Sequence, residues 1–209
     1  MHEEQLEPVA PTVPSQDGSE PVTPEPENVP EAASRRGALL LLGGLVVVLA
    51  VFFVVAFAPK GEPANGRLPG DPAGYAMPTL VMPKLDGSGT LDLASLRGKP
   101  IVVNFWASWC EPCQAEAALM GAAEKTWRSK GVVFIGIDSE DKPAEAKAFM
   151  TKYGIAYSSV SNPDATANAR WGVTGYPETF FIGRDGRIVS KFISSLDKAT
   201  LDSSISAIL

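Results

Sequence analysis

The chain has 209 residues, of which 24 are acidic and 18 basic, and its formal net charge is −6. This length allows one ordinary domain with additional segments. Residues 59–209 contain 16 acidic and 16 basic residues, which argues against nucleic acid as a partner because such binding needs clustered positive charge. The single histidine, His2, excludes Ser-His-Asp and Cys-His hydrolases.

Residues 1–36 are predicted to form a disordered, acidic, proline-rich cytoplasmic tail. Residues 1–34 carry eight acidic side chains, seven prolines and no Lys or Arg. Such a segment buries too little apolar surface to offset its conformational entropy. A charged interaction arm is the alternative interpretation.

Residues 37–58 are predicted to be a transmembrane anchor that contacts the lipid bilayer. The segment has no charged residue, and its 22 residues can cross a hydrocarbon core of about 30 Å. Arg35 and Arg36 flank its N-terminal end, whereas only Lys60 lies close on the other side. The positive-inside rule therefore predicts a cytoplasmic N-terminus and an extracytoplasmic C-terminal domain in the cell membrane.

A cleaved signal peptide is the alternative to this anchor, because "AFA" at residues 56–58 resembles a cleavage site. The apolar run is longer than the usual signal peptide core, a long polar segment precedes it, and Pro59 should hinder cleavage. These features favour an uncleaved anchor.

Residues 59–77 are predicted to be a Pro/Gly-rich linker and residues 78–209 a globular domain. Short apolar runs on either side of Asp86–Gly89 indicate an N-terminal hairpin. The apolar, β-branched Ile101–Trp106 is typical of a central strand buried on both faces. A helix should begin near Pro112, since proline suits a first helical turn.

The helix near Pro112 has an apolar stripe at Leu119, Ala123 and Trp127, and Gly131 should end it. Further elements should alternate between strand and helix, which predicts an α/β fold with a central mixed sheet flanked by helices. They are a strand at 132–137, a helix from Pro143 to Gly154, a short helix near 164–170, a strand within 172–182, a turn at 184–187, a strand at 188–193 and a helix at 198–208.

Cys110 and Cys113 are the only cysteines in the chain. A structural disulfide at this spacing closes a very small loop and contributes little by loop entropy. A zinc site needs about four ligands, so no metal is expected. An inert thiol pair fits poorly at a helix start, and a redox-active pair within a βαβ unit is favoured.

The redox interpretation has a physical mechanism. Cys110 should lie at the N-terminal end of the helix, where free N–H groups and the helix dipole stabilise a thiolate. Cys113 lies one turn further and can attack a mixed disulfide formed at Cys110. No cofactor is expected other than the Cys110–Cys113 disulfide.

The segment "VVNFWASWCEPCQAE" resembles the active site of the thioredoxin superfamily. Together with "LDG…LDLASLRGKP" and "GVTGYPETFFIGRDGRIV", it resembles the membrane-anchored, extracytoplasmic thioredoxin-like thiol-disulfide oxidoreductases of cytochrome c maturation. The resemblance covers residues 78–209 and implies a thioredoxin-like fold.

The resemblance also implies roles for individual residues. Cys110 matches the nucleophilic cysteine, Cys113 the resolving cysteine and Pro177 the cis-proline that faces them. Tyr176 precedes this proline at a position that shapes the substrate groove. The predicted substrate-binding residues are Trp109, Glu111, Pro112, Tyr176 and Pro177.

Glu116 matches an acidic residue of the reducing subgroup, three positions after the second cysteine. At this spacing it shares a helix face with Cys113 and could carry a proton to or from the pair. The alternative is an exposed first-turn glutamate that stabilises the helix dipole. Asn104 stands where ordinary thioredoxins have a buried aspartate, so that Glu116 is the residue expected to take over proton transfer.

Glu111 lies between the cysteines, where its charge opposes a Cys110 thiolate and should raise the thiol pKa. This favours a reductant over a strong oxidant. The predicted function is reduction of disulfides in exported proteins such as apocytochrome c, with electrons from a membrane donor. The alternatives are an oxidant of exported thiols, a non-enzymatic module that binds partners at the Pro177 groove and, less favoured, a thiol peroxidase.

Overall fold

The computed structural model describes residues 35–57 and 70–209, and it divides into two compact units at Phe53/Val54. The predictions for residues 1–34 and 58–69 lie outside the described residues. Helix α1 (Arg35–Phe57) exposes its apolar side chains from Leu45 to Val55. In the described ranges, no helix is long and apolar enough to cross a membrane, so the predicted anchor is not confirmed.

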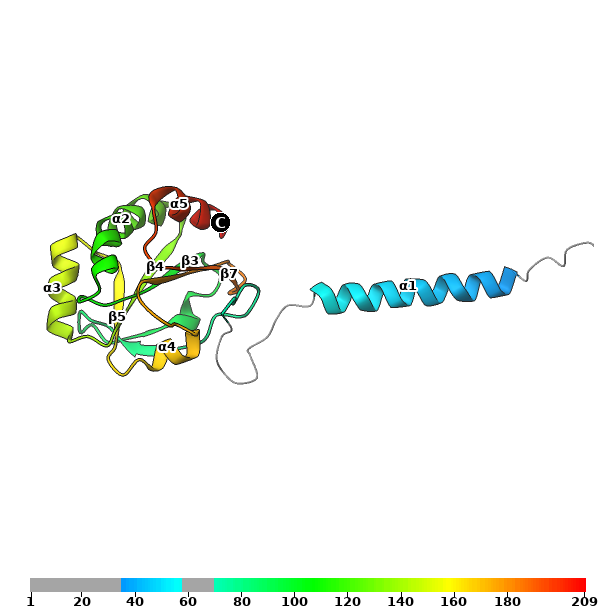
Figure 1. Ribbon diagram of the computed structural model, residues 1–209, viewed down its shortest axis with the longest axis horizontal. Helices are drawn as coiled ribbons and strands as arrows, with labels where there is room; N and C mark the ends of the chain where they lie inside the picture. The colour runs from blue at the N-terminus through cyan, green and yellow to red at the C-terminus, as the bar shows by residue number, and fades with distance from the viewer. Residues whose placement is uncertain (1–34, 58–69) are drawn as a thin grey trace, which may run out of the picture. The chain divides into compact units, whose positions relative to one another are not determined.

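The C-terminal unit contains a mixed five-stranded sheet in the order β5-β4-β3-β6-β7 (Figure 1). Its central strand β3 runs parallel to β4 and antiparallel to β6, which confirms the predicted mixed sheet. The strands are β3 (Ile101–Trp106), β4 (Val133–Ser139), β5 (Ser158–Asn162), β6 (Glu178–Ile182) and β7 (Ile188–Ile193).

The predicted N-terminal hairpin is confirmed as β1 (Val81–Pro83) and β2 (Thr90–Asp92), which pair antiparallel. The chain between them also reaches the edge strand β5, because Leu85 N–H donates to Ser159 O at 2.9 Å. Residues 74–77 form backbone hydrogen bonds to the turn before β7 and to its first residue, so this part of the predicted linker packs with the domain.

Helices cover both faces of the sheet (Figure 1). Helices α2, α3 and α5 pack on one face, whereas α4 and the hairpin pack on the other. Strand β3 serves both cores by alternation: Val102 and Trp106 point to the first face, and Val103 and Phe105 to the second. The helices are α2 (Glu111–Trp127), α3 (Pro143–Tyr153), α4 (Thr166–Trp171) and α5 (Lys198–Ser206), with 3₁₀ turns at Leu93–Leu96 and Arg128–Lys130.

Helix ends follow the local sequence closely. Helix α2 begins at Glu111, with Cys110 as its N-cap and a proline in the first turn. Gly131 closes the 3₁₀ turn after α2, and Gly154 closes α3, both with a positive φ that glycine accepts without steric cost. Leu119 is only partly buried, because the inner face of α2 runs through Met120.

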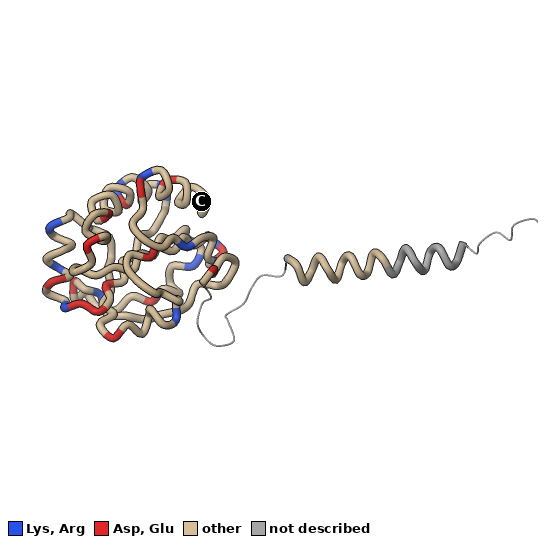
Figure 2. Tube along the Cα trace, in the orientation of Figure 1, with Lys and Arg blue, Asp and Glu red and all other residues tan. Residues whose placement is uncertain are grey.

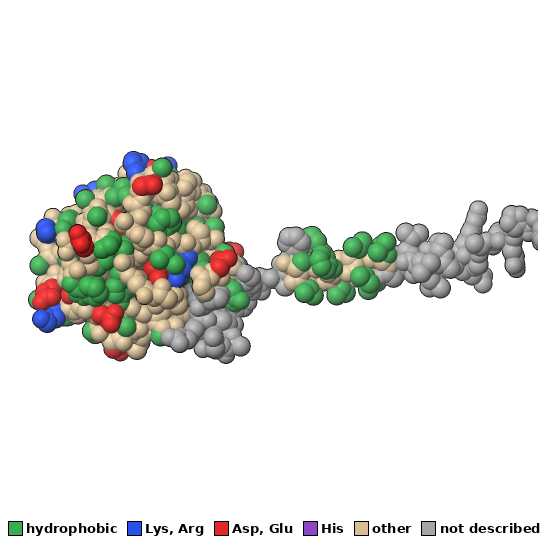
Figure 3. All heavy atoms as spheres, in the orientation of Figure 1, with side chains coloured by type: hydrophobic (Ala, Val, Ile, Leu, Met, Phe, Trp, Pro, Cys, Tyr) green, Lys and Arg blue, Asp and Glu red, His purple; other side chains and the backbone are tan. Residues whose placement is uncertain are grey.

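Charged residues of both signs are distributed around the C-terminal unit (Figure 2). On the face drawn in Figure 3, hydrophobic, acidic and basic side chains are intermixed. This distribution agrees with the balanced charge of residues 59–209 and offers no large basic surface on that face.

Candidate active site

Cys110 and Cys113 form a disulfide at the N-terminal end of α2, with an S–S distance of 2.05 Å and a Cα–Cα distance of 5.2 Å. The Cys113 N–H donates to Cys110 Sγ at 3.1 Å, so that Cys110 caps the helix through its sulfur. In the reduced pair, this N–H and the helix dipole favour a thiolate at Cys110. The predicted position of the pair is therefore confirmed.

Both cysteines are buried, Cys110 at 5 % exposure and Cys113 at 2 %. Their neighbours Glu111 and Pro112 are exposed, and Trp109 has 57 % of its surface open to solvent. A partner that reaches the sulfur atoms must therefore contact these flanking residues.

The Tyr176–Pro177 peptide bond is cis, as predicted. Tyr176 packs against the hydrophobic cluster that contains both cysteines. Its ring meets the Trp109 indole edge-to-face, with 5.7 Å between ring centroids. The loop before the cysteines and the cis-proline loop, which lie far apart in the sequence, are thus brought together at one site.

Glu116 is buried at 3 % exposure, on the inner face of α2 together with Cys113. Its Oε1 accepts a hydrogen bond from Asn104 Nδ2 at 3.0 Å, and its Oε2 accepts one from Leu196 N–H at 2.9 Å. Burial raises the pKa of Glu116 to about 7, because desolvation outweighs these two hydrogen bonds. The alternative of an exposed first-turn glutamate is therefore wrong.

Two aspartates, Asp138 near the end of β4 and Asp141 in the loop after it, were not identified from the sequence. Asp138 is 1 % exposed, and neither carboxyl oxygen has a hydrogen-bond partner among the residues that the structure describes. Burial and the charge of Asp141 raise the pKa of Asp138 to about 8. Asp141 accepts hydrogen bonds from the N–H groups of Ser108 at 2.6 Å and Lys142 at 2.7 Å, and so holds the loop that leads to Cys110.

A buried ion pair supports the cis-proline loop and was also missed. Lys191 Nζ lies 2.6 Å from Glu178 Oε2, and both side chains are almost inaccessible to solvent. Glu178 Oε1 accepts hydrogen bonds from the N–H and hydroxyl of Thr174, both at 2.9 Å. Glu178 directly follows Pro177, and Thr174 lies three residues before it. Through its contacts with Thr174 and Lys191, Glu178 therefore fixes the loop on both sides of that proline. The only signal in the sequence was the pair of opposite charges in otherwise apolar strands.

The described ranges contain no group of three or more His, Cys, Asp or Glu side chains that could hold a metal ion.

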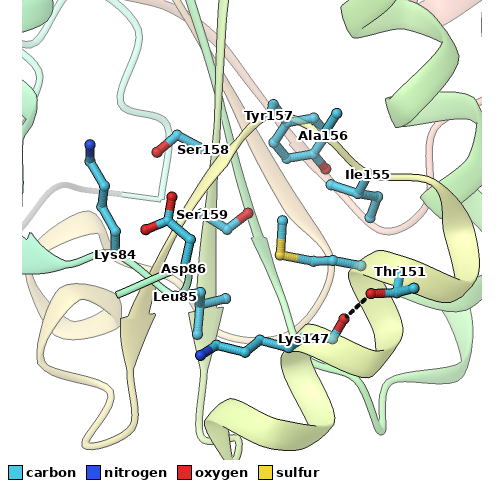
Figure 4. A pocket seen from close by; sticks show the side chains of 11 residues that line it. Lys84, Leu85, Asp86, Lys147, Thr151, Ile155, Ala156, Tyr157, Ser158 and Ser159 are labelled. Carbon is cyan, nitrogen blue, oxygen red and sulfur yellow. Dashed lines mark hydrogen bonds between the residues drawn. The ribbon is translucent and has the colours of Figure 1, made fainter. Parts of the chain in front are cut away.

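A pocket of about 600 Å³ lies between the hairpin loop, α3 and β5 (Figure 4). Lys84, Asp86 and Lys147 contribute to its lining, but neither cysteine does. The disulfide site is therefore separate from this pocket.

A disulfide-bonded Cys-x-x-Cys pair at a helix start, a neighbouring cis-proline loop and a mixed sheet between helices define a thioredoxin-like protein. The sequence profile of the AhpC/TSA family matches residues 73–191. Because this match covers more than half of the sequence, the chain belongs to the AhpC/TSA family. The family resemblance predicted from the sequence is confirmed.

Proteins with similar sequences have names that describe thiol-disulfide chemistry. The thiol:disulfide interchange protein DsbE of Pseudomonas fluorescens biotype C is 36 % identical over 159 residues, which cover 74 % of this chain and 86 % of that protein. The thiol-disulfide oxidoreductase ResA of Bacillus thuringiensis (strain Al Hakam) is 30 % identical over 129 residues, 62 % of this chain and 74 % of that protein.

Solved structures agree with the fold. A secreted disulfide oxidoreductase of Mycobacterium tuberculosis, described as homologous to Escherichia coli DsbE, superposes with a TM-score of 0.56 at 28 % identity. The match covers 61 % of this chain and 95 % of that one. The thioredoxin-like part therefore accounts for almost the whole of that structure.

Proposed function

We propose that the protein is a membrane-tethered, extracytoplasmic thiol-disulfide oxidoreductase that reduces disulfides of exported proteins, with apocytochrome c as the favoured substrate. The observation that carries this proposal is the Cys110–Cys113 disulfide at the start of α2 beside the cis-proline loop. The relatives DsbE and ResA are named as a thiol:disulfide interchange protein and a thiol-disulfide oxidoreductase, which supports thiol-disulfide exchange as the chemistry.

The reaction proceeds in two exchange steps. The Cys110 thiolate attacks one sulfur of a substrate disulfide, forms a mixed disulfide and releases one substrate thiolate. The Cys113 thiolate then attacks Cys110 Sγ, releases the second substrate thiolate and closes the Cys110–Cys113 disulfide. Two electrons pass to the substrate, and a membrane electron donor must return two electrons to the pair.

Glu116 is the proposed proton acceptor for Cys113. A pKa of about 7 leaves the protonated and ionised carboxyl both populated near neutral pH, which suits a group that accepts and returns a proton. Asn104 cannot ionise, but it orients the Glu116 carboxyl by donating to Oε1. Substrate contacts are assigned to the surface around the pair, which comprises Trp109, Glu111, Pro112, Tyr176 and Pro177.

The direction of the reaction is tested with the reduced full-length chain in detergent. It should reduce a peptide that carries the Cys-x-x-Cys-His motif of c-type haem attachment as a disulfide. The oxidised chain should not oxidise the reduced peptide to a comparable extent. Thiol and disulfide peptide are quantified by mass after acid quenching and alkylation. Net oxidation of the peptide would favour the oxidant alternative. If Cys110→Ser, which lacks the nucleophilic thiol, still performed the protein's function, the non-enzymatic binding module would be favoured.

The tether is proposed from the sequence of residues 37–58, which contain no charged side chain, and from Arg35 and Arg36 beside them. Protease added to intact spheroplasts should digest the C-terminal domain and spare residues 1–34. Immunoblotting with antibodies against the two ends checks this expectation. A released soluble fragment that starts near Pro59 would show that the segment is a cleaved signal peptide.

A further inference from the structure

Glu140 lies in the loop between β4 and α3 and has a φ angle of 55°, in the left-handed region that favours glycine. Its Cβ crowds the backbone there, so that a glutamate costs more than a glycine would. Backbone strain of this kind persists where surrounding contacts hold it, and it is frequent at functional sites. The hydrogen bonds that hold Glu140 in this conformation therefore indicate its role.

Glu140 holds two loops that are distant in the sequence. Its carbonyl oxygen accepts a hydrogen bond from Trp109 Nε1 at 3.0 Å. Its carboxylate Oε2 accepts one from the Tyr176 hydroxyl at 2.8 Å. Trp109 directly precedes Cys110, and Tyr176 directly precedes Pro177. One residue thus connects the loop of the nucleophile to the cis-proline loop.

The Tyr176 hydroxyl is also held from the interior. The Asn168 side-chain amide donates to it, and Asn168 Oδ1 accepts hydrogen bonds from Ser139 and Asn162 at 2.9 Å each. Burial and the hydrogen bond to Glu140 raise the pKa of Tyr176 to about 12, so the hydroxyl keeps its proton as a donor. The ring is therefore fixed against Trp109, whose outer surface is open to solvent.

We propose that Glu140 is a positioning residue that holds Trp109 and Tyr176 together as one aromatic wall of the substrate groove beside Cys110. This inference rests on the proposed function, because the wall matters only if a disulfide substrate docks there. A wall that is already ordered spares the substrate the cost of ordering it. Loss of the Glu140 carboxylate should therefore weaken docking more than it slows exchange.

The decisive variant is Glu140→Gly, which removes the carboxylate, keeps the carbonyl oxygen and suits the positive φ. The reduced full-length chain in detergent is mixed with excess Cys-x-x-Cys-His disulfide peptide, and the rate is followed against peptide concentration. The half-saturating concentration should rise about tenfold, as expected for the loss of one hydrogen bond to a charged group, while the limiting rate changes less than about threefold.

Two further variants complete the design. Tyr176→Phe should raise the half-saturating concentration at least as much, because it removes the hydrogen bond from Asn168 as well as the one to Glu140. The double variant should add little to Tyr176→Phe, since the hydrogen bond to Glu140 is already lost in that variant. Glu145→Gln is the matched control: this carboxylate lines a pocket together with Trp109 and Glu140, but it pairs with Lys142 at 3.2 Å. The control should remain within about twofold of the wild type.

The Trp109 indole N–H provides a readout that is independent of activity. Its nuclear magnetic resonance signal, assigned through Trp109→Phe, should exchange faster with solvent in Glu140→Gly than in the wild type or in Glu145→Gln. A wild-type half-saturating concentration with an unchanged indole signal, or additive effects in the double variant, would overturn the inference. A wild-type chain that does not reduce the peptide contradicts the proposed function instead, and the indole signal then tests the coupling alone.

Discussion

Cys110→Ser is expected to lower the rate of disulfide reduction by at least about 1,000-fold, because a serine hydroxyl cannot replace the thiolate nucleophile at neutral pH. Cys110 caps α2, where the helix dipole and the Cys113 N–H favour its thiolate. Stopped-flow mixing of the reduced chain with the disulfide peptide measures this rate.

Cys113→Ser provides the complementary experiment. Cys110 should still attack in this variant, but the mixed disulfide can no longer be resolved within the protein and should accumulate. Mass spectrometry of the acid-quenched mixture should find the peptide attached to Cys110. A trapped peptide in Cys110→Ser, attached to Cys113, would reverse the roles of the two cysteines.

Glu116→Gln should slow the resolving step by about 100-fold and remove a pH dependence centred near pH 7. Glutamine cannot accept the proton of Cys113, although it keeps the shape of the side chain. Rates measured from pH 5 to 9 should rise through pH 7 in the wild type and remain flat over this step in the variant. Glu124→Gln is a matched control, because Glu124 is also buried on α2 but pairs with Arg128 at 3.9 Å.

The same carboxyl should affect stability with a defined sign. The pKa of Glu116 is raised from 4.5 to about 7 in the folded state. Between these pH values the folded chain holds a proton that the unfolded chain has released, so stability falls as pH rises. This contribution is roughly 3 kcal/mol and should be absent in Glu116→Gln. Urea unfolding at pH 4.5 and pH 8 measures this difference in the free energy of unfolding. If the wild type and Glu116→Gln lost the same amount of stability between these two pH values, the assignment would be contradicted.

The strand and helix around the cysteines were predictable because their signals are local. Ile101–Trp106 is apolar on both faces, and a proline marks the first turn of the following helix. Strand β5 was not predicted, because Ser158–Asn162 contains three serines and one large apolar residue. It is a strand because β4 pairs with it on one side and Leu85 on the other.

The residues of the candidate active site also fall into those that local sequence signals reveal and those that depend on contacts between distant segments. The cysteines and Pro177 were predictable from a motif that lies within short segments of sequence. The surroundings of Glu116 were not, because its partners Asn104 and Leu196 lie 12 and 80 residues away. Glu140 gave no signal in the sequence, since its role depends on a backbone conformation and on loops that only the fold brings together.

The midpoint potential of the Cys110–Cys113 pair tests most directly whether the protein is a reductant. Glu111 places a negative charge between the cysteines, where it opposes the thiolate of the reduced pair. Equilibration of the full-length chain with dithiothreitol and glutathione buffers should give a potential nearer to the roughly −270 mV of thioredoxin than to the roughly −120 mV of a strong exported oxidant. Glu111→Gln should raise that potential. A wild-type value near −120 mV, or a lower potential in Glu111→Gln, would contradict the reductant and favour an oxidase.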